Sequence, residues 1–282
     1  MPKAVLGRRG LLSATAATLF TVPLAAVLLD PIGRAFGLRS RQAEQAAAAS
    51  SGSSHLAQVR ALVDNLNRLG WPNRNNRYCH SGEPTVLRWG TPGKSATYRA
   101  QAQCSTFVTK LLSHTYRWAD ERFFRRTFGS TSPYPTDYYR VFAKGSSSRF
   151  RPIRKVAELR AGDLIAVDYS PETRTRTGHL MVVKAVKGRY TARGNIRGTT
   201  QYVVEVVDCT STPHATPGNR ETNRFPDSRI ASSRKYHGVG YGHVVLYADN
   251  RTGAVWGHRW SVIASAIHPV RRRRVAMVRV AG

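Results

Sequence analysis

Cys104 is the residue of this chain whose type and setting best suit covalent chemistry. It precedes Phe107, Val108, Leu111 and Leu112, and this spacing predicts a helix that begins at or near the cysteine. The unpaired N–H groups and partial positive charge at a helix N-terminus stabilise a thiolate and can hold the oxyanion of an acyl transition state. The pattern therefore predicts that Cys104 is a nucleophile.

A thiol nucleophile needs an imidazole as its base and a polar group that orients the imidazole. His179 opens the apolar run Leu180–Val183, and an earlier apolar run, Leu164–Val167, is separated from it by a polar loop. Two such runs predict a β-hairpin. The next run, Tyr202–Val207, ends on Asp208. If these strands are neighbours in one antiparallel sheet, Asp208 faces His179 and is the predicted orienting carboxylate.

Two other histidines are candidates for the site. His243 also opens an apolar run and is the alternative base, and a site that uses neither His179 nor His243 is the remaining possibility. We favour His179 because the strand after it ends on a carboxylate. His214, in the loop beyond Asp208, is a candidate to line the substrate cleft.

The N-terminal segment predicts export. Arg8 and Arg9 stand directly before the uncharged apolar stretch from Leu11 to Leu29, which resembles a twin-arginine signal. An uncleaved membrane anchor and a buried helix are the alternatives. The protein is therefore expected in the periplasm, the cell envelope or the medium, with membrane contact only through an uncleaved N-terminal segment.

The chain divides into three predicted parts. Residues 1–45 are the export signal and its boundary region, residues 46–75 are a linker and an amphipathic helix, and residues 76–282 are the catalytic domain. The linker is rich in Ala, Ser and Gly, a composition that cannot bury much apolar surface. The periodic residues of Leu56–Leu69 predict the helix, and Gly70 ends it.

The cysteine count raises the question of pairing. An exported protein with three cysteines keeps one unpaired if the other two form a disulfide. Cys79 and Cys209 lie in polar neighbourhoods with no apolar helical run, so they are the predicted disulfide pair and Cys104 is the predicted free thiol. The alternative is that all three thiols are reduced and buried.

The charge balance indicates anionic partners. The chain has 44 Lys and Arg against 16 Asp and Glu, a formal net charge of +28. Such a field attracts polyanions of any kind. The basic residues are scattered apart from Arg271–Arg274, and no zinc-ligand spacing or RNA-binding aromatic pattern accompanies them. We therefore expect peptidoglycan or another anionic envelope polymer as the partner, and no nucleic acid, metal or cofactor.

The motifs together resemble the NlpC/p60 group of papain-like cell-wall cysteine peptidases and, more loosely, the CHAP amidases. The family has a Cys-Ser-Gly-hydrophobic helix start, a Gly-Asp-Leu strand and a Gly-His-Val strand in this order. Cys104–Val108, Gly162–Ile165 and Gly178–Val183 are similar to them. Trp89-Gly90 is similar to the Trp-Gly pair before the family's cysteine.

The resemblance implies an α+β fold, a papain-like domain in which N-terminal helices pack on an antiparallel β-sheet. It implies Cys104 as nucleophile, His179 as base and Asp208 in the third polar position. Trp89 and Ser105 are then expected to contact the substrate. The chain departs from the family at Gln103, Thr106 and Leu87, where Asp, Gly and Tyr are usual.

The predicted function is hydrolysis of amide bonds in an envelope substrate, with peptidoglycan peptides as the leading candidate. One alternative keeps the fold and the thiol but transfers the acyl group to an amine or a lipid. The other is a non-catalytic exported basic protein that binds envelope polyanions.

Export through the twin-arginine route depends on Arg8 and Arg9. We predict that replacing both with Lys retains the protein in the cytoplasm, because the paired arginines are the recognised element of such a signal. Fractionation followed by immunoblotting measures this. Export of the double-Lys variant as efficiently as wild type would refute the assignment.

Overall fold

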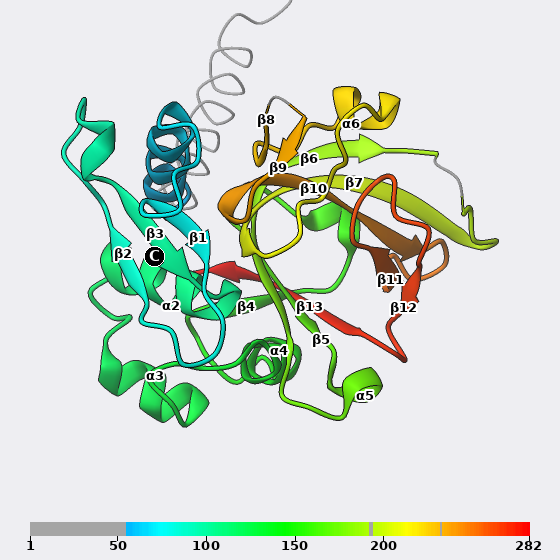
Figure 1. The fold of residues 1–282 in the computed structure, drawn as a ribbon. Helices are drawn as coiled ribbons and strands as arrows, with labels where there is room; N and C mark the ends of the chain where they lie inside the picture. The colour runs from blue at the N-terminus through cyan, green and yellow to red at the C-terminus, as the bar shows by residue number, and fades with distance from the viewer. Residues whose placement is uncertain (1–54, 192–193, 232) are drawn as a thin grey trace, which may run out of the picture. The chain divides into compact units, whose positions relative to one another are not determined.

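The computed structural model describes residues 55–191, 194–231 and 233–282. The predicted export signal and linker, up to residue 54, lie outside the described residues. Within the described ranges, no helix is long and apolar enough to cross a membrane. The described chain is a mixed α and β structure with one large antiparallel sheet and a few helices, in agreement with the coarse fold class predicted from the sequence (Figure 1).

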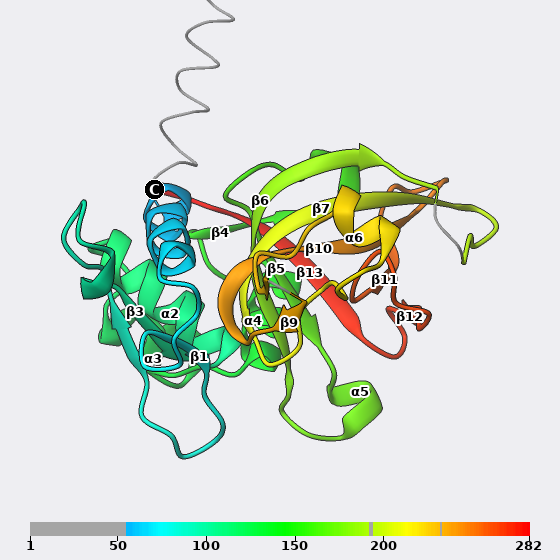
Figure 2. The same cartoon turned by 45° about the horizontal axis from the view of Figure 1, so that its top comes forward.

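The large sheet has eight strands in the order β12-β11-β10-β7-β6-β5-β13-β4, and neighbouring strands are antiparallel. Their bounds are Phe150–Ile153 (β4), Leu164–Asp168 (β5), Gly178–Arg189 (β6), Thr199–Thr210 (β7), Gly238–Asp249 (β10), Val255–Arg259 (β11), His268–Pro269 (β12) and Arg274–Val280 (β13). The long strands β6, β7 and β10 lie side by side (Figure 2). The predicted hairpin, formed by β5 and β6, is confirmed.

Both faces of the central strands are buried, which explains why these strands read as continuous apolar runs. In β7, Val207 packs in the core that contains the helices, whereas Val204 and Val206 pack in a second core on the opposite face. Val156 belongs to the second core, and its backbone N–H donates to the carbonyl of Gly253 at 3.0 Å. This contact ties the segment after β4 to the turn after β10.

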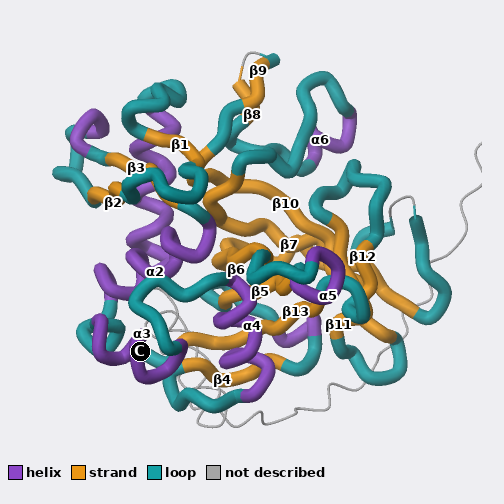
Figure 3. Tube along the Cα trace, turned by 60° about the horizontal axis from the view of Figure 1, so that its bottom comes forward, coloured by secondary structure: helices purple, strands orange, loops and turns teal. Residues whose placement is uncertain are grey.

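The longer helices pack on one face of this sheet. They are a helix over residues 55–68, α2 (Cys104–Thr115), α3 (Glu121–Phe128) and α4 (Pro135–Lys144). The shorter helical segments are η1 (Ser95–Thr97), η2 (Val156–Glu158), α5 (Ser170–Thr173) and α6 (Arg220–Arg224). Leu62, Phe107 and Phe142 share one buried core with Leu180 of β6. Figure 3 shows α2 and α4 beside the strands of the sheet.

The predicted amphipathic helix is confirmed over residues 55–68. Its apolar residues Leu56, Val59, Leu62 and Val63 are buried in the same core as α2 and the sheet. The chain leaves the helix through Gly70, whose φ of +67° favours glycine. The helix is thus part of the same compact unit as the sheet that carries the predicted site.

Two small sheets were not identified from the sequence. The first has β3 (Arg99–Ala102) between β1 (Asn76–Tyr78), to which it is parallel, and β2 (Val86–Arg88), to which it is antiparallel. The second pairs β8 (Ile230–Ala231) with β9 (Arg234–Lys235). These strands are too short to show an alternating pattern. The first sheet matters for the site because β3 runs through Gln103 directly into α2.

Candidate active site

Cys104 is the first residue of α2, as predicted. Gln103 precedes the helix in an extended conformation, with φ −90° and ψ 166°, and its side chain makes no capping hydrogen bond. The helix is held in place by Phe107, Val108 and Leu111, which are fully buried. The Cys104 thiol lies beside the first residue of β6, where its Sγ is 3.8 Å from the carbonyl oxygen of Gly178.

His179 is the second residue of β6 and is 5% exposed. Its neighbour Gly178 permits a close approach of β6 to β5, because a Cβ there would lie 2.1 Å from the carbonyl oxygen of Val167. The imidazole of His179 is hydrogen-bonded to the Cys104 side chain. Its Nε2 is 2.5 Å from Oδ2 of Asp208, which leaves Nδ1 for the sulfur.

Asp208 lies on β7, is fully buried and completes the predicted trio. Its Oδ2 is also 2.9 Å from Nε2 of His214. Its Oδ1 accepts a hydrogen bond of 2.8 Å from Nη1 of Arg229, a second fully buried charged residue. Arg229 in turn donates from Nη2 to Asp227 at 2.8 Å. The Asp208 carboxylate therefore has a hydrogen-bond donor on each side.

The electrostatics of the trio favour an ionised Asp208 and a protonated His179. Burial alone would raise the pKa of the Asp208 carboxyl, but Arg229 and His214 outweigh it and hold this pKa well below its ordinary value. Burial likewise lowers the pKa of His179. The interactions of His179 with Cys104 and Asp208 outweigh that effect and raise the pKa of His179 to about 9. At neutral pH the imidazole is therefore positively charged.

The Cys104 thiol opens into a cleft of about 580 Å³. Its lining is mostly small or hydroxyl-bearing: Ser81, Gly82, Thr85, Ser105, Thr106, Ser130, Ser132, Pro133, Pro135, Thr177 and Gly178, with Tyr78, His80, Glu83, Gln103, Tyr134 and Arg176. Arg176 lies over the ring of Tyr134, with its guanidinium carbon 4.8 Å from the ring centroid. The cleft therefore suits a polar substrate.

Of the three residues predicted to contact the substrate, Ser105 lines this cleft, whereas His214 and Trp89 do not. His214 is 1% exposed and lies behind Asp208 instead of in the cleft. Trp89 stacks on His114 of α2, with ring centroids 4.0 Å apart, and donates from Nε1 to the carbonyl of Gln58 at 3.3 Å. Trp89 thus joins two helices.

His243, the alternative base, does not reach the thiol. It lies on β10, and its Nδ1 is 3.0 Å from the carbonyl oxygen of Pro226. Burial lowers the pKa of His243 to about 4. A neutral imidazole held by a loop carbonyl, away from Cys104, cannot take the place of His179.

Three residues behind the trio were missed from the sequence: Asp227, Arg229 and Trp260. The Trp260 ring meets His179 edge-on at 4.8 Å between centroids and stacks on His214 at 4.1 Å. The acid-x-base pair Asp227 and Arg229 is the one local signal available, but it falls in a segment that reads as loop. Their burial results from contacts distant in sequence.

The side chains of His179, Asp208 and His214 place one ligand atom each within 4.8 Å of one another, which raises the question of a metal. The hydrogen bonds that join Asp208 Oδ2 to both imidazoles already use the atoms a metal would need. The Arg229 guanidinium, 2.8 Å from the same carboxylate, would also repel a dication. The cluster is therefore suited to orienting an imidazole.

The predicted disulfide between Cys79 and Cys209 is wrong. Among the described residues all three cysteines, including Cys104, are free and buried, as the alternative prediction held. The Cys209 thiol donates to the carbonyl of Ala102 at 3.1 Å, and the Cys79 thiol lies 3.7 Å from the carbonyl of Pro84. Burial raises the pKa of both Cys79 and Cys209. The polar neighbours of Cys209 in sequence suggested a disulfide, but the Cys209 side chain faces the hydrophobic core.

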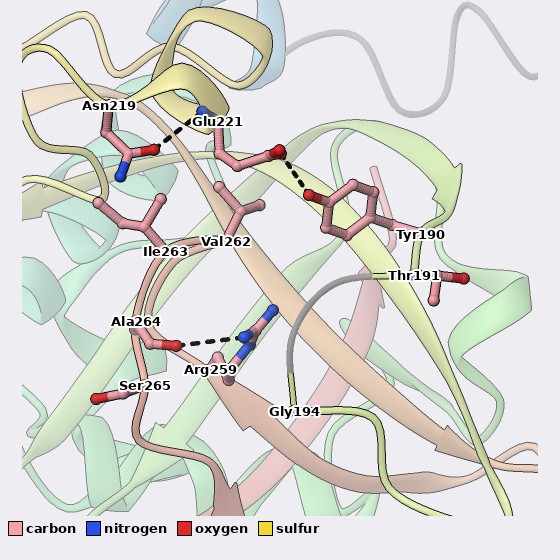
Figure 4. A pocket seen from close by; sticks show the side chains of 10 residues that line it. All are labelled: Tyr190, Thr191, Gly194, Asn219, Glu221, Arg259, Val262, Ile263, Ala264 and Ser265. Carbon is pink, nitrogen blue, oxygen red and sulfur yellow. Dashed lines mark hydrogen bonds between the residues drawn. The ribbon is translucent and has the colours of Figure 1, made fainter.

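A second cavity, of about 740 Å³, lies apart from the trio (Figure 4). Its lining residues include Asn219, Val262, Ile263 and Ser265, and none of them is a cysteine or histidine. The Tyr190 hydroxyl donates to Glu221 across it. Among the described residues that line this cavity there is no cysteine or histidine to pair as nucleophile and base, so the Cys104 cleft is the candidate active site.

Comparison of the chain with models of protein families, with curated proteins and with solved structures finds no match. The assignment of the site therefore rests on its geometry and on the resemblance of its motifs.

The free thiols lead to a prediction on alkylation. We expect iodoacetamide to modify Cys104 alone in the native protein, because Cys104 opens into the cleft and Cys79 and Cys209 are fully buried. After unfolding without reductant, all three cysteines should react. Mass spectrometry of the peptides measures both states. A Cys79–Cys209 bridge in the unfolded sample, or an unreactive native Cys104, would contradict the structure.

Proposed function

We propose that this protein is an exported cysteine hydrolase of the papain-like NlpC/p60 type, which cleaves amide bonds in peptidoglycan peptides. The observation that carries the proposal is the hydrogen-bonded series from Cys104 through His179 to Asp208, at the edge of a cleft. A helix that begins on the cysteine and an antiparallel sheet that carries the other two residues agree with the papain-like arrangement implied by the motifs.

The first half of the reaction forms an acyl-enzyme. The Cys104 thiolate attacks the amide carbonyl, and the oxyanion forms beside the first backbone N–H groups of α2, to which no side-chain cap is bound at Gln103. The His179 imidazolium then gives its proton to the leaving amine. The C–N bond breaks, and a thioester to Cys104 remains.

The second half restores the enzyme. Neutral His179 takes a proton from water, the hydroxide attacks the thioester carbonyl, and the acid product leaves as the sulfur regains its negative charge. Asp208 keeps the imidazole oriented and stabilises its charged form throughout. An amine in place of water would give acyl transfer at the same site, so product analysis separates the two reactions.

The substrate class is supported by the cleft and by the charge of the chain. The cleft presents hydroxyls and small side chains, which suit a polar peptide with short side chains. A net charge of +28 favours association with anionic envelope polymers. Export by the twin-arginine route would bring the enzyme to this substrate.

The proposal predicts a graded loss of activity in three variants. Cys104→Ala and His179→Ala should each abolish measurable turnover. For His179→Ala this means a rate at least about 10²-fold below that of wild type. Asp208→Asn should leave a small residual rate. The losses should not add in double variants, because the residues act as one unit. Release of new amino groups from purified peptidoglycan measures turnover.

His114→Gln, which changes a histidine outside the cleft, is the matched control and should keep wild-type activity. A His179→Ala enzyme with more than about a tenth of wild-type activity would rule out His179 as the base. Inactivity of wild type on peptidoglycan would remove the proposed substrate.

A further inference from the structure

Both ring nitrogens of His214 face atoms that accept hydrogen bonds. Nδ1 is 2.6 Å from the carbonyl oxygen of Trp260, and Nε2 is 2.9 Å from Oδ2 of Asp208. A carbonyl oxygen cannot donate, and an ionised carboxylate cannot donate either. Asp208 is ionised, because its other oxygen receives the Arg229 guanidinium at 2.8 Å. Both nitrogens of His214 must therefore carry a hydrogen.

We propose that His214 is a permanent imidazolium that acts as a positioning residue for the His179–Asp208 pair and sets the pH range in which Cys104 and His179 work together. The inference rests on the proposed function, because it takes Cys104, His179 and Asp208 as the reacting trio. It adds a residue that touches neither the substrate nor the sulfur.

The charges that surround His214 come from several elements and balance. Asp208 reaches it from β7, and the segment before β8 supplies Arg229 and Asp227, whose Oδ2 also accepts the backbone N–H of His214 at 2.7 Å. His179 lies on the other side of Asp208, on β6. With a positive His214, two carboxylates are balanced by one guanidinium and one imidazolium. A neutral His214 would leave this buried group with an excess negative charge.

His243 on β10 is a further titratable group that interacts with His214, and its pKa is lowered by burial to about 4. It is neutral at neutral pH and leaves the charge balance unchanged. The charged groups around His214 are thus Asp208 itself, Arg229, which donates to Asp208, and Asp227, which accepts from Arg229.

The backbone around His214 leaves room for it. A Cβ at Gly242 would lie 2.3 Å from Cδ2 of His214 and 2.9 Å from Nη2 of Arg229. A Cβ at Gly240 would lie 2.9 Å from Cγ of Arg229. The Trp260 ring covers His214 from the other side. Gly240 and Gly242 on β10 therefore leave the space that the side chains of Arg229 and His214 occupy.

The first effect of His214 is geometric. Oδ2 of Asp208 takes a hydrogen bond from each imidazole and Oδ1 takes one from Arg229, so the carboxylate cannot rotate away from His179. A fixed carboxylate fixes the ring that it holds, and with it the direction of Nδ1 toward the sulfur.

The second effect is electrostatic. The ring nitrogens of His179 and His214 lie within 4.8 Å of each other and share one carboxylate oxygen. A positive His214 therefore disfavours the protonated form of His179. Replacing it with a neutral residue should let His179 keep its proton to higher pH. With an effective dielectric constant of about 20 and nitrogens no more than 4.8 Å apart, the expected shift is on the order of two pH units.

The protonation state is tested directly by ¹H–¹⁵N NMR of the imidazole rings in the full-length protein. At about pH 8, where an ordinary histidine is mostly neutral, we expect protons on both nitrogens of His214. The spectrum of His214→Gln assigns the ring. A single protonated nitrogen on His214 at this pH would overturn the proposal.

The functional consequence is tested with iodoacetate, whose negative charge makes its reaction with Cys104 depend on a positive His179. In wild type the rate should fall as pH rises through about 9, where His179 loses its proton. In His214→Gln this fall should move up by on the order of two pH units. An unchanged position would overturn the proposal, because a merely structural residue would alter the rate without moving the profile.

His55→Gln is the matched control, since His55 is equally buried and also bonded at both nitrogens, to Tyr116 and Gly162, without contact to Asp208. Its profile should match wild type, and an equal shift in His55→Gln would overturn the specific role of His214. The wild-type protein could release no amino groups from peptidoglycan while His214→Gln still shifts the iodoacetate pH profile as predicted. That result would support the role of His214 and would rule out only the proposed substrate. A wild-type profile with no fall at high pH would overturn both proposals.

Discussion

The buried carboxylate of Asp208 is the group on which the site depends. A fully buried negative charge is stable only if it is paired and hydrogen-bonded, and Asp208 meets this condition through His179, His214 and Arg229. Each partner constrains another part of the chain. His179 fixes the start of β6, and Arg229 ties down the segment before β8 through its contact with Asp227. A change at any of these positions would leave a buried charge without its partner.

Strands β6, β7 and β10 and helix α2 surround the Asp208 carboxylate and its partners. The register of β7 with β10 pairs Asp208 with Gly240, and a hydrogen bond joins Asp208 to His179 near the start of β6. The helical core holds the start of α2 beside the first residues of β6. Apolar packing therefore determines where the sulfur lies, and hydrogen bonds determine how the imidazole meets it. The cleft remains polar because its walls come from loops and from the ends of helices and strands.

The sequence predicted those parts of the site that depend on local pattern. Helical spacing located the start of α2 at Cys104, and strand patterns placed His179 opposite Asp208. Parts that depend on distant contacts were not predictable in this way. Arg229 and Trp260 lie in segments without periodicity, His214 is buried only because those segments fold over it, and Cys209 faces the core although its neighbours in sequence are polar. Burial of a polar residue is a property of the folded chain.

The interaction between the Cys104 sulfur and the His179 imidazole is best tested by measuring the thiolate itself. The ultraviolet absorbance of the thiolate, taken as the difference between wild type and Cys104→Ala, reports its charge without any substrate. The proposed site predicts substantial thiolate at neutral pH in wild type and its loss in His179→Ala, because the imidazolium that stabilises the anion is then absent. Equal thiolate absorbance in wild type and His179→Ala at neutral pH would contradict the assignment of these two residues as nucleophile and base.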